Sequence, residues 1–279
     1  MTNNLDINLK PIIKYVGGKS KVLPTIKEYM PKSFNTYYEP FIGGGSVLFG
    51  LRPQKAVIND ISKELINIYK VVRDNPEALI TDLKQHINEK DYYYFIRSKD
   101  RDETIYNSMT DVQKASRLIY LNKTGFNGLI RFNKKGQFNV PMGKYANPNI
   151  VNESVIRAVS KYLNDNDIKI TNLDFVKACE NAKAGDFIYA DSPYIPLSKT
   201  SSFVSYSAEG FSFEDQIRLR DLAIDLNKRG CKIMLSNSSS ELVFDLYKDF
   251  KIKRVKVARA INSKATARGK IDEVIITNY

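Results

Sequence analysis

Short apolar runs that alternate with helical patterns constrain the fold of this chain more than any other feature. Such runs occupy residues 56–58, 187–190, 232–235, 252–257 and 273–277. Several lack strict alternation of apolar and polar residues, which is typical of strands buried on both faces. Between two of them, Ser212–Asp215 has the form of a capping box, apolar residues follow at helical spacing, and Gly230 ends the helix. This order of strand, helix and strand predicts a doubly wound α/β sheet, and the last two runs could form an antiparallel edge.

The middle of the chain follows a different pattern. Leu79, Leu83 and Ile87 recur at four-residue spacing, and a second helical stripe consists of Val112, Ala115, Leu118, Ile119 and Asn122. Residues 131–140 have two aromatic-containing arms around Lys134-Lys135-Gly136, which indicates a β-hairpin with a positively charged tip. We therefore expect residues 62–163 to form a mainly helical domain with a hairpin, inserted into a sheet domain of residues 1–61 and 164–279.

Charge and composition narrow the class of partner. The 279 residues carry a formal net charge of +12, and the pI is near 9.4. This balance favours a polyanion such as nucleic acid, although a merely soluble basic enzyme is equally compatible with it. The sequence shows no secretory leader and no apolar run long enough to span a bilayer, so we expect a soluble, cytoplasmic protein without a membrane partner.

The few cysteines and histidines limit the available chemistry. Cys179 and Cys231 lie far apart in the sequence, which fits a reducing compartment and predicts no disulfide framework. His86, the single histidine, lies in a polar stretch that reads as helical, so we expect an exposed structural role for it. A zinc cluster cannot easily be assembled from these residues, and we expect no metal. The chemistry must come from carboxylates, amides, hydroxyls and a cofactor.

A glycine-rich turn, Glu39–Gly45, follows the first part of the chain. A phosphate-binding P-loop would need a glycine where Ile13 stands, and a dinucleotide fingerprint starting at Gly43 would need one where Leu48 stands. What remains is a strand, a turn that lets a ligand approach the backbone closely, and a helix. The next strand ends in Asn59-Asp60, which places a carboxylate where a ribose diol would lie in a nucleoside-binding domain. A tight turn with a helix-terminal aspartate is the equally weighted structural alternative.

The tetrapeptide Asp191-Ser192-Pro193-Tyr194 follows an apolar run directly. A flat exocyclic amine is a poor nucleophile because its lone pair is delocalised into the ring. The Asp191 carboxylate and the Ser192 carbonyl could accept its two N–H bonds, and Tyr194 could stack on the ring while a methyl donor lies in line. A proline-containing turn after a strand is the structural alternative, but together with the glycine turn the tetrapeptide favours an amino-group methyltransferase.

Six motifs in order resemble those of DNA adenine-N6 methyltransferases of the Dam type, over essentially the whole chain. They are Lys14–Lys19, Glu39–Gly45, Ile58–Asp60, Asn127–Arg131 with Phe138–Pro141, Leu173–Phe175 and Asp191–Tyr194. The resemblance implies a Rossmann-like methyltransferase sheet, S-adenosylmethionine as the methyl donor, and double-stranded DNA as the substrate. A restriction endonuclease of the same system is a candidate partner that need not touch this chain.

The resemblance also implies roles for individual residues. Tyr15 and Lys19 would hold the amino-acid end of the cofactor. The turn from Glu39 through Phe41 and Gly43 to Gly45 would wrap the cofactor. Asp60 would accept from its ribose, Asp174 with Phe175 would hold its adenine, and Asp191 would face both the methyl group and the target base. Catalysis would fall to Asp191, Ser192, Pro193 and Tyr194.

For DNA, the resemblance points to the hairpin and its approach. The residues concerned are Lys14, Phe126, Asn127, Leu129, Arg131, Lys134, Lys135, Pro141 and Tyr145. Arg131 could make a forked contact with a guanine, whereas Phe126 could fill the stack that a flipped adenine leaves. The two lysines would reach phosphates or only solvent. The implied target is GATC. A second basic region, residues 251–270, could lie along the phosphate backbone or merely be solvated.

One position departs from the family pattern, because Ser192 stands where a proline is usual. Serine keeps the carbonyl but lacks the ring that fixes φ, so we expect reduced preorganisation with the chemistry retained. A first alternative is therefore a DNA-binding protein that has weak or no turnover. A second is an enzyme that methylates a glutamine amide in a protein, which would not need the basic hairpin. Cytosine C5 methylation is disfavoured because neither cysteine follows a proline.

Overall fold

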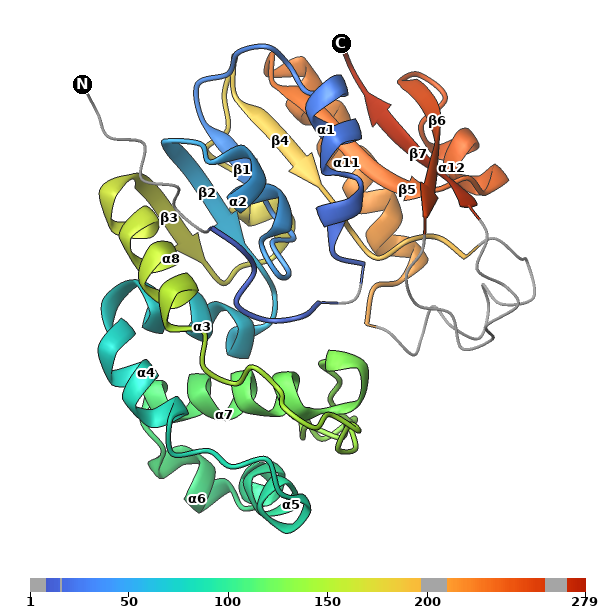
Figure 1. Cartoon of the computed structure of the whole chain (residues 1–279). Helices are drawn as coiled ribbons and strands as arrows, with labels where there is room; N and C mark the ends of the chain where they lie inside the picture. The colour runs from blue at the N-terminus through green and yellow to red at the C-terminus, as the bar shows by residue number, and fades with distance from the viewer. Residues whose placement is uncertain (1–8, 16, 197–209, 259–269) are drawn as a thin grey trace. The chain divides into compact units, whose positions relative to one another are not determined.

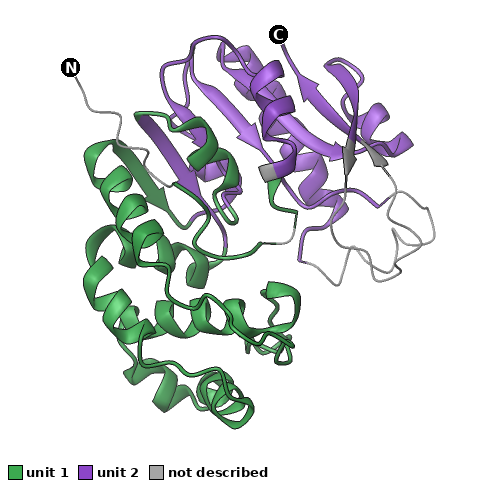
Figure 2. Ribbon diagram, viewed as in Figure 1, with its two compact units in different colours: residues 1–20, 43–54, 62–172 green, residues 21–42, 55–61, 173–279 purple. Residues whose placement is uncertain are grey.

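The computed structural model describes residues 9–15, 17–196, 210–258 and 270–279. It forms two compact units, which Figure 2 colours separately. Unit 1 comprises residues 1–20, 43–54 and 62–172, and unit 2 comprises residues 21–42, 55–61 and 173–279. The helical segment predicted at residues 62–163 lies in unit 1, which also takes in the N-terminal motif and most of the glycine turn. The functional division of the chain into two domains stays a prediction.

Unit 2 contains the sheet. Its strands are β1 (Tyr37–Glu39), β2 (Lys55–Asn59), β4 (Phe187–Ala190), β5 (Lys232–Ser238), β6 (Lys251–Ala258) and β7 (Lys270–Thr277). They lie in the order β2-β1-β4-β5-β7-β6, and the first four stand side by side in Figure 1. β2, β1, β4 and β5 pair in parallel, whereas β7 pairs antiparallel with both β5 and β6. The five predicted strands and the antiparallel edge are confirmed.

The helices of unit 2 are α1 (Leu23–Tyr29), α9 (Phe175–Ala178), α11 (Phe213–Lys228) and α12 (Glu241–Leu246). α11 begins with the predicted capping box, in which Ser212 and Asp215 bond reciprocally through side chain and backbone. Gly230 follows with a φ of +79°, a left-handed conformation that suits glycine after a helix. The buried face of α11, which includes Leu222 and Leu226, packs into the core formed with β4 and β5.

Unit 1 is mainly helical, as predicted. Its regular elements are α2 (Ser46–Leu51), α3 (Lys63–Asp74), α4 (Pro76–Leu83), α5 (Lys90–Ser98), α6 (Glu103–Ser108), α7 (Asp111–Thr124), α8 (Glu153–Asp165) and the strand β3 (Asp167–Thr171), with short 3₁₀ turns η2 (Lys99–Arg101) and η3 (Phe126–Gly128). A further 3₁₀ turn, η1 (Lys19–Lys21), begins at its N-terminal motif. α7 contacts α3, α4 and α5 (Figure 1). All residues of the predicted stripe except Val112 are buried.

Two expectations about the segment after α4 are wrong. α4 ends at Leu83, and Ile87 lies outside it with 46% of its surface exposed. The His86 side chain is only 8% exposed. Its ring stacks on Tyr120 at 4.4 Å, and its two nitrogens lie 2.9 and 3.1 Å from the hydroxyls of Tyr92 and Ser116. A neutral imidazole both donates and accepts, so two hydroxyls satisfy it without a charge. Burial lowers the pKa of His86 to about 4.

Three expected absences concern only the described residues. No helix among them is long and apolar enough to cross a membrane. Within the same part of the chain, no group of three or more His, Cys, Asp or Glu residues is placed to hold a metal ion. Cys179 and Cys231 are both free and buried. The basic region predicted at residues 251–270 lies partly on β6, and its segment 259–269 is outside the described residues.

Candidate active site

The site begins at a switch in the order of the parallel strands. β1 is followed in the chain by β2 on one side of it, and later by β4 on its other side. In open α/β sheets, ligands bind outside the carboxyl ends of the strands at such a switch point. Glu39 is the last residue of β1, and Asp191 follows the last residue of β4 directly. The sheet topology therefore places both sequence-predicted carboxylates at the edge where a ligand is expected.

The tetrapeptide is anchored through its second half. Gln216 Nε2 donates to the carbonyl of Pro193 at 2.7 Å, and the Ile195 N–H donates to Asn237 Oδ1 at 3.0 Å. The Tyr194 hydroxyl donates to Glu273 Oε2 at 2.9 Å. Ser192 is 3% exposed. The residue that departs from the family pattern is therefore buried, and each of the three residues after it is held by a hydrogen bond.

The electrostatics at this edge of the sheet are negative. Burial, and then the charges of Asp191 and Glu273, raise the pKa of Tyr194 well above its ordinary value. Burial also raises the pKa of Tyr189 well above the usual value, with further contributions from Asp191, Glu39 and Glu273. Both phenols consequently stay protonated at working pH, and the Tyr194 hydroxyl donates a hydrogen bond to Glu273. A cationic methyl donor is the kind of ligand that such a cluster of carboxylates favours.

Asn59 ties together the loops beside the ribose candidate Asp60. Its side-chain amide donates to the carbonyls of Pro40 and Leu173 at 3.1 and 2.9 Å and accepts from the Leu173 N–H at 2.9 Å. Its own carbonyl accepts from Ile42 N–H at 2.8 Å. Asn59 is 1% exposed and Asp60 8%. One buried amide thus fixes the exit of β1, the end of β2 and the segment leading to Asp174.

The adenine candidates of unit 2 lie together. The rings of Phe41 and Phe175 are 5.3 Å apart. Asp174 caps α9 by accepting from the Val176 N–H at 3.0 Å, and it also accepts from Arg218 at 2.8 Å. The Arg218 guanidinium lies 4.9 Å from the Phe175 ring centre. A carboxylate has about four acceptor sites, so these bonds do not exhaust those of Asp174. The residues fit a flat ring that carries an amine.

In unit 1 the glycine turn packs against aromatic side chains. Gly43 has a φ of +49°, and a Cβ there would lie 2.9 Å from the Tyr15 ring. At Gly45, with a φ of +75°, a Cβ would lie 2.7 Å from the Tyr69 hydroxyl, and that hydroxyl donates to the Gly43 carbonyl at 2.8 Å. Glycine is required at both positions, so the turn brings Tyr15 against the backbone expected to wrap the cofactor. Lys19 is 7% exposed, and its ammonium donates to the Gly17 carbonyl at 3.2 Å.

A second cluster in unit 1 brings together several of the residues predicted to bind DNA. Asn122, fully buried, accepts from the Lys14 N–H and donates to the Lys14 carbonyl, both at 2.8 Å. It also donates to the Gly128 carbonyl at 2.7 Å. The Lys14 ammonium lies 4.3 Å from the centre of the Tyr145 ring. Lys14, Tyr145 and the turn that carries Asn127 and Leu129 are therefore neighbours. Asn127 is exposed in a left-handed conformation, with a φ of +54°.

The predicted hairpin is present as a bridged loop without regular strands. An antiparallel bridge joins Phe132 to Phe138, and a second joins Gly125 to Met142. Arg131, exposed, donates from Nε to Asn139 Oδ1 at 2.7 Å. Guanidinium has five donors, so this bond orients the side chain and leaves donors for a base. Phe126 is half exposed, and its N–H bonds to the carbonyl of exposed Pro141 at 2.9 Å, whereas the exposed Lys134 and Lys135 form the tip.

The structure also brings forward residues to which the sequence assigned no role. They are the buried amides Asn59, Asn122, Gln216 and Asn237, the carboxylate Glu273, and Arg218. The sequence held a signal for two of them, since Asn122 interrupts an otherwise apolar stripe and Asn237 follows the apolar run at residues 232–235. Gln216 and Arg218 are ordinary positions in an amphipathic helix, and nothing in the sequence distinguishes them.

Several known proteins are similar to this chain over nearly its whole length. The family model of the D12 class N6 adenine-specific DNA methyltransferases matches residues 15–261. A "Type II methyltransferase M1.LlaDCHI" of Lactococcus lactis is 53% identical, over 98% of this chain and 96% of its own length. A "Type II methyltransferase M.MjaIII" of Methanocaldococcus jannaschii is 42% identical over 98% of this chain and 100% of its length. A "DNA adenine methylase" of Escherichia coli is 30% identical over 95% of this chain and 94% of its own length. The chain therefore belongs to the D12 class of N6 adenine-specific DNA methyltransferases.

Proposed function

We propose that this DNA adenine methyltransferase flips its target adenine out of the double helix and methylates it within GATC. The position of Asp191 and Ser192 carries the proposal. They follow β4 at the switch point of the sheet, beside the end of β1. A base inside a duplex cannot reach such a site, so it must leave the stack first.

The chain's own residues would activate the amine. The Asp191 carboxylate and the Ser192 carbonyl accept its two N–H bonds, which favours a pyramidal nitrogen with an available lone pair. Tyr194 stacks on the ring, and its bond to Glu273 fixes the tilt of the phenol. After transfer, the nitrogen carries an extra proton, and the Asp191 carboxylate is the nearest candidate acceptor in this arrangement.

S-adenosylmethionine, which membership in the family implies, supplies an electrophilic methyl group. Asp60 would accept from its ribose, and Asp174 from its adenine amine, beside Phe41 and Phe175. Tyr15, Lys19, Glu39, Gly43 and Gly45 complete the proposed set. The glycine turn and the aromatic pair support this assignment, since both offer close approach to a flat, polar ligand.

The hairpin would read the DNA. Arg131 contacts a guanine through its remaining donors, and Asn127, Leu129 and Pro141 lie against neighbouring bases. Phe126 fills the vacated stack, whereas Lys14, Lys134, Lys135 and Tyr145 hold the backbone. GATC rests on the resemblance of these motifs to the Dam type. The names of two relatives contain "Type II methyltransferase", which supports a place in a restriction-modification system.

Sequencing of DNA from cells that express this chain, scored for methyladenine by sequence context, tests the proposal. Methylation confined to GATC is expected. Another motif would overturn the hairpin assignment alone, and absence of any methylated motif would favour a DNA-binding protein without turnover.

Asp191→Ala tests the catalytic assignment separately. Transfer from labelled S-adenosylmethionine to a GATC duplex should be lost, whereas the Kd for that duplex should stay within about threefold, because Asp191 acts on the amine and contributes little binding energy. Persistent transfer would show that Asp191 is not the catalytic carboxylate.

A further inference from the structure

We infer that Gln216 and Asn237 are positioning residues that hold the carbonyl of Ser192 in its reactive place. The inference rests on the proposed role of the tetrapeptide. Gln216 binds the Pro193 carbonyl at 2.7 Å, one peptide after the Ser192 carbonyl. Asn237 binds the Ile195 N–H at 3.0 Å. The two amides also meet each other, since Asn237 Nδ2 lies 3.4 Å from Gln216 Oε1.

The two amides, Gln216 and Asn237, form a buried anchor for the loop after Ser192. Gln216 is 1% exposed, Asn237 2% and Ile195 0%. Ser238 adds a bond from its hydroxyl to the Ile195 carbonyl. A buried polar group that loses its partner cannot turn to water, so these bonds favour this arrangement of the loop over others. Three consecutive residues after Ser192 are thereby fixed: Pro193 and Ile195 through the backbone and Tyr194 through Glu273.

Regular elements carry the anchoring side chains. Gln216 lies in the first turn and a half of α11, directly after the capping box of Ser212 and Asp215. Asn237 lies near the end of β5, which pairs with β4 on one side and β7 on the other. Glu273, on β7, is the pairing partner of Ser238. Groups on such elements are positioned more accurately than groups on loops.

This anchor explains how the chain accommodates Ser192. A proline there would fix φ by its ring, and serine does not. The following Pro193 restricts Ser192 to extended conformations, and Gln216 then fixes the peptide that follows. Two amides thus supply the preorganisation that is lost at Ser192. Gln216 lies 23 residues after its partner Pro193, and Asn237 lies 42 residues after its partner Ile195.

The test separates positioning from stability. Gln216→Met keeps the length of the side chain but removes the donor, so the Ser192 carbonyl loses its support. Single-turnover transfer should slow about 10–100-fold, because small misplacements of catalytic groups cost rates of this order. The Kd values for S-adenosylmethionine and for a target duplex should stay within about threefold. Ser212→Ala is the matched control, since it weakens the same helix through its cap and should leave the transfer rate unchanged.

Gln216→Glu adds a measurement, the pH dependence of the transfer rate, that would not change if Gln216 only stabilised the fold. Its carboxylate cannot donate to the Pro193 carbonyl, whereas its protonated form can. Relative to wild type, its transfer rate should rise as pH falls from about 8 to 6, because burial raises the pKa of a carboxylic acid. Gln216→Met should show no such rise. This variant also serves if Gln216→Met fails to fold.

The inference is overturned if Gln216→Met transfers methyl at the wild-type rate, or if Ser212→Ala slows transfer equally at matched thermal stability. A transfer rate for Gln216→Glu that, relative to wild type, does not change with pH would overturn it as well. Failure of the proposed function looks different, because either the wild-type chain would then transfer no methyl group or Asp191→Ala would transfer it at the wild-type rate.

Discussion

Asn122 shows how one buried side chain can organise a candidate DNA-binding surface. It makes three hydrogen bonds, two to the backbone of Lys14 and one to the Gly128 carbonyl, and is fully buried. Gly128 packs so closely that a Cβ there would lie 2.4 Å from the Lys14 side chain. The N-terminal motif and the 126–128 turn are therefore held as one piece.

Replacing this amide gives the first prediction. Asn122→Leu has a similar volume but leaves three backbone groups without their partner, at a cost of about 1–3 kcal/mol each where no water reaches them. Urea unfolding should show a loss of at least about 2 kcal/mol, and the Kd for a target duplex should rise. Asn149→Ala, at an exposed amide in the loop before α8, is the control and should change the free energy of unfolding by less than about 0.5 kcal/mol. Equal effects of the two substitutions would contradict the argument.

His86 gives a prediction for acid pH. Its folded-state pKa is about 4, below the ordinary value of 6.5, because burial disfavours the charged ring. The unfolded chain therefore binds more protons between these values, and the stabilisation present above pH 6.5 is lost as pH falls towards 4. His86→Gln removes the titrating group. Urea unfolding at pH 7.5 and 5.0 should show a loss on acidification that is smaller in the variant by about 2 kcal/mol; identical losses would contradict the role of burial.

At the scale of elements, the five strands, the α11 capping box and the end of α11 at Gly230 were predictable, whereas the end of α4 and the side-chain partners were not. Buried strands and the α11 capping box follow local patterns of two to eight residues. No glycine or proline marks the end of α4 at Leu83. The apolar stripe therefore predicts a helix that continues through Ile87 and includes His86. The tetrapeptide Asp191–Tyr194 was recognisable as a motif, but the partners of Pro193 and Ile195 come from α11 and β5. Such contacts depend on tertiary packing, which a local pattern does not encode.

The start of α7 supplies the element-scale prediction. Thr110 and Gln113 form a complete capping box before the helix that contacts α3, α4 and α5. Thr110→Ala should lower the free energy of unfolding by about 1 kcal/mol, because one orphan N–H loses its acceptor. Thr81→Ala is the control, since its exposed hydroxyl bonds within a helix that has other partners. Thermal unfolding of both variants checks the result, and a Thr110 effect no larger than that of Thr81 would show that the cap is dispensable.

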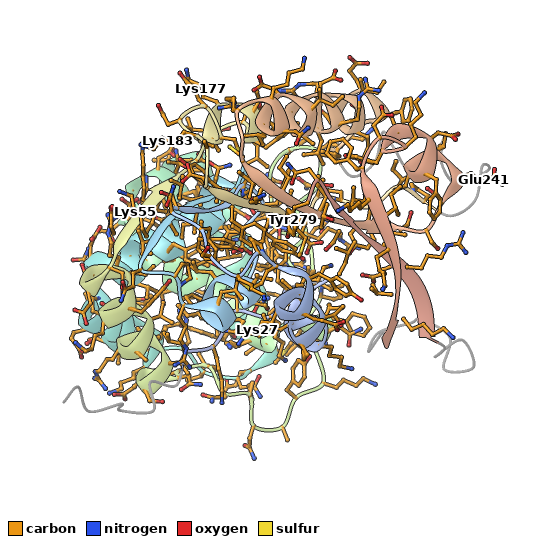
Figure 3. The ribbon with its side chains drawn as sticks, turned by 90° about the horizontal axis from the view of Figure 1, so that it is seen from above. Lys27, Lys55, Lys177, Lys183, Glu241 and Tyr279 are labelled. Atoms are coloured by element: carbon orange, nitrogen blue, oxygen red, sulfur yellow. The ribbon has the colours of Figure 1, made fainter. Side chains whose placement is uncertain are left out.

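For the whole molecule, the attraction of positive charge to DNA can be distinguished from the recognition of a base sequence. Exposed lysines such as Lys55, Lys177 and Lys183, which Figure 3 labels, contribute to the net charge of +12. Such charges favour any polyanion and carry no information on base sequence. Arg131, in contrast, is oriented by Asn139, which suits a forked contact with one base. The two kinds of contact should respond differently to salt and to the target sequence.

This difference gives the last prediction. Lys134→Ala combined with Lys135→Ala should reduce the slope of log K against log salt by about 2, because each phosphate contact contributes about 0.9. Affinity should fall alike for a GATC duplex and for one with the guanine replaced. Arg131→Ala should leave most of the slope but lose about 1–3 kcal/mol of discrimination between the two duplexes. Fluorescence anisotropy at four salt concentrations measures both quantities. If the lysine pair altered discrimination and Arg131 altered only the slope, the assignment of the hairpin tip to phosphate and of its arm to the base would be reversed.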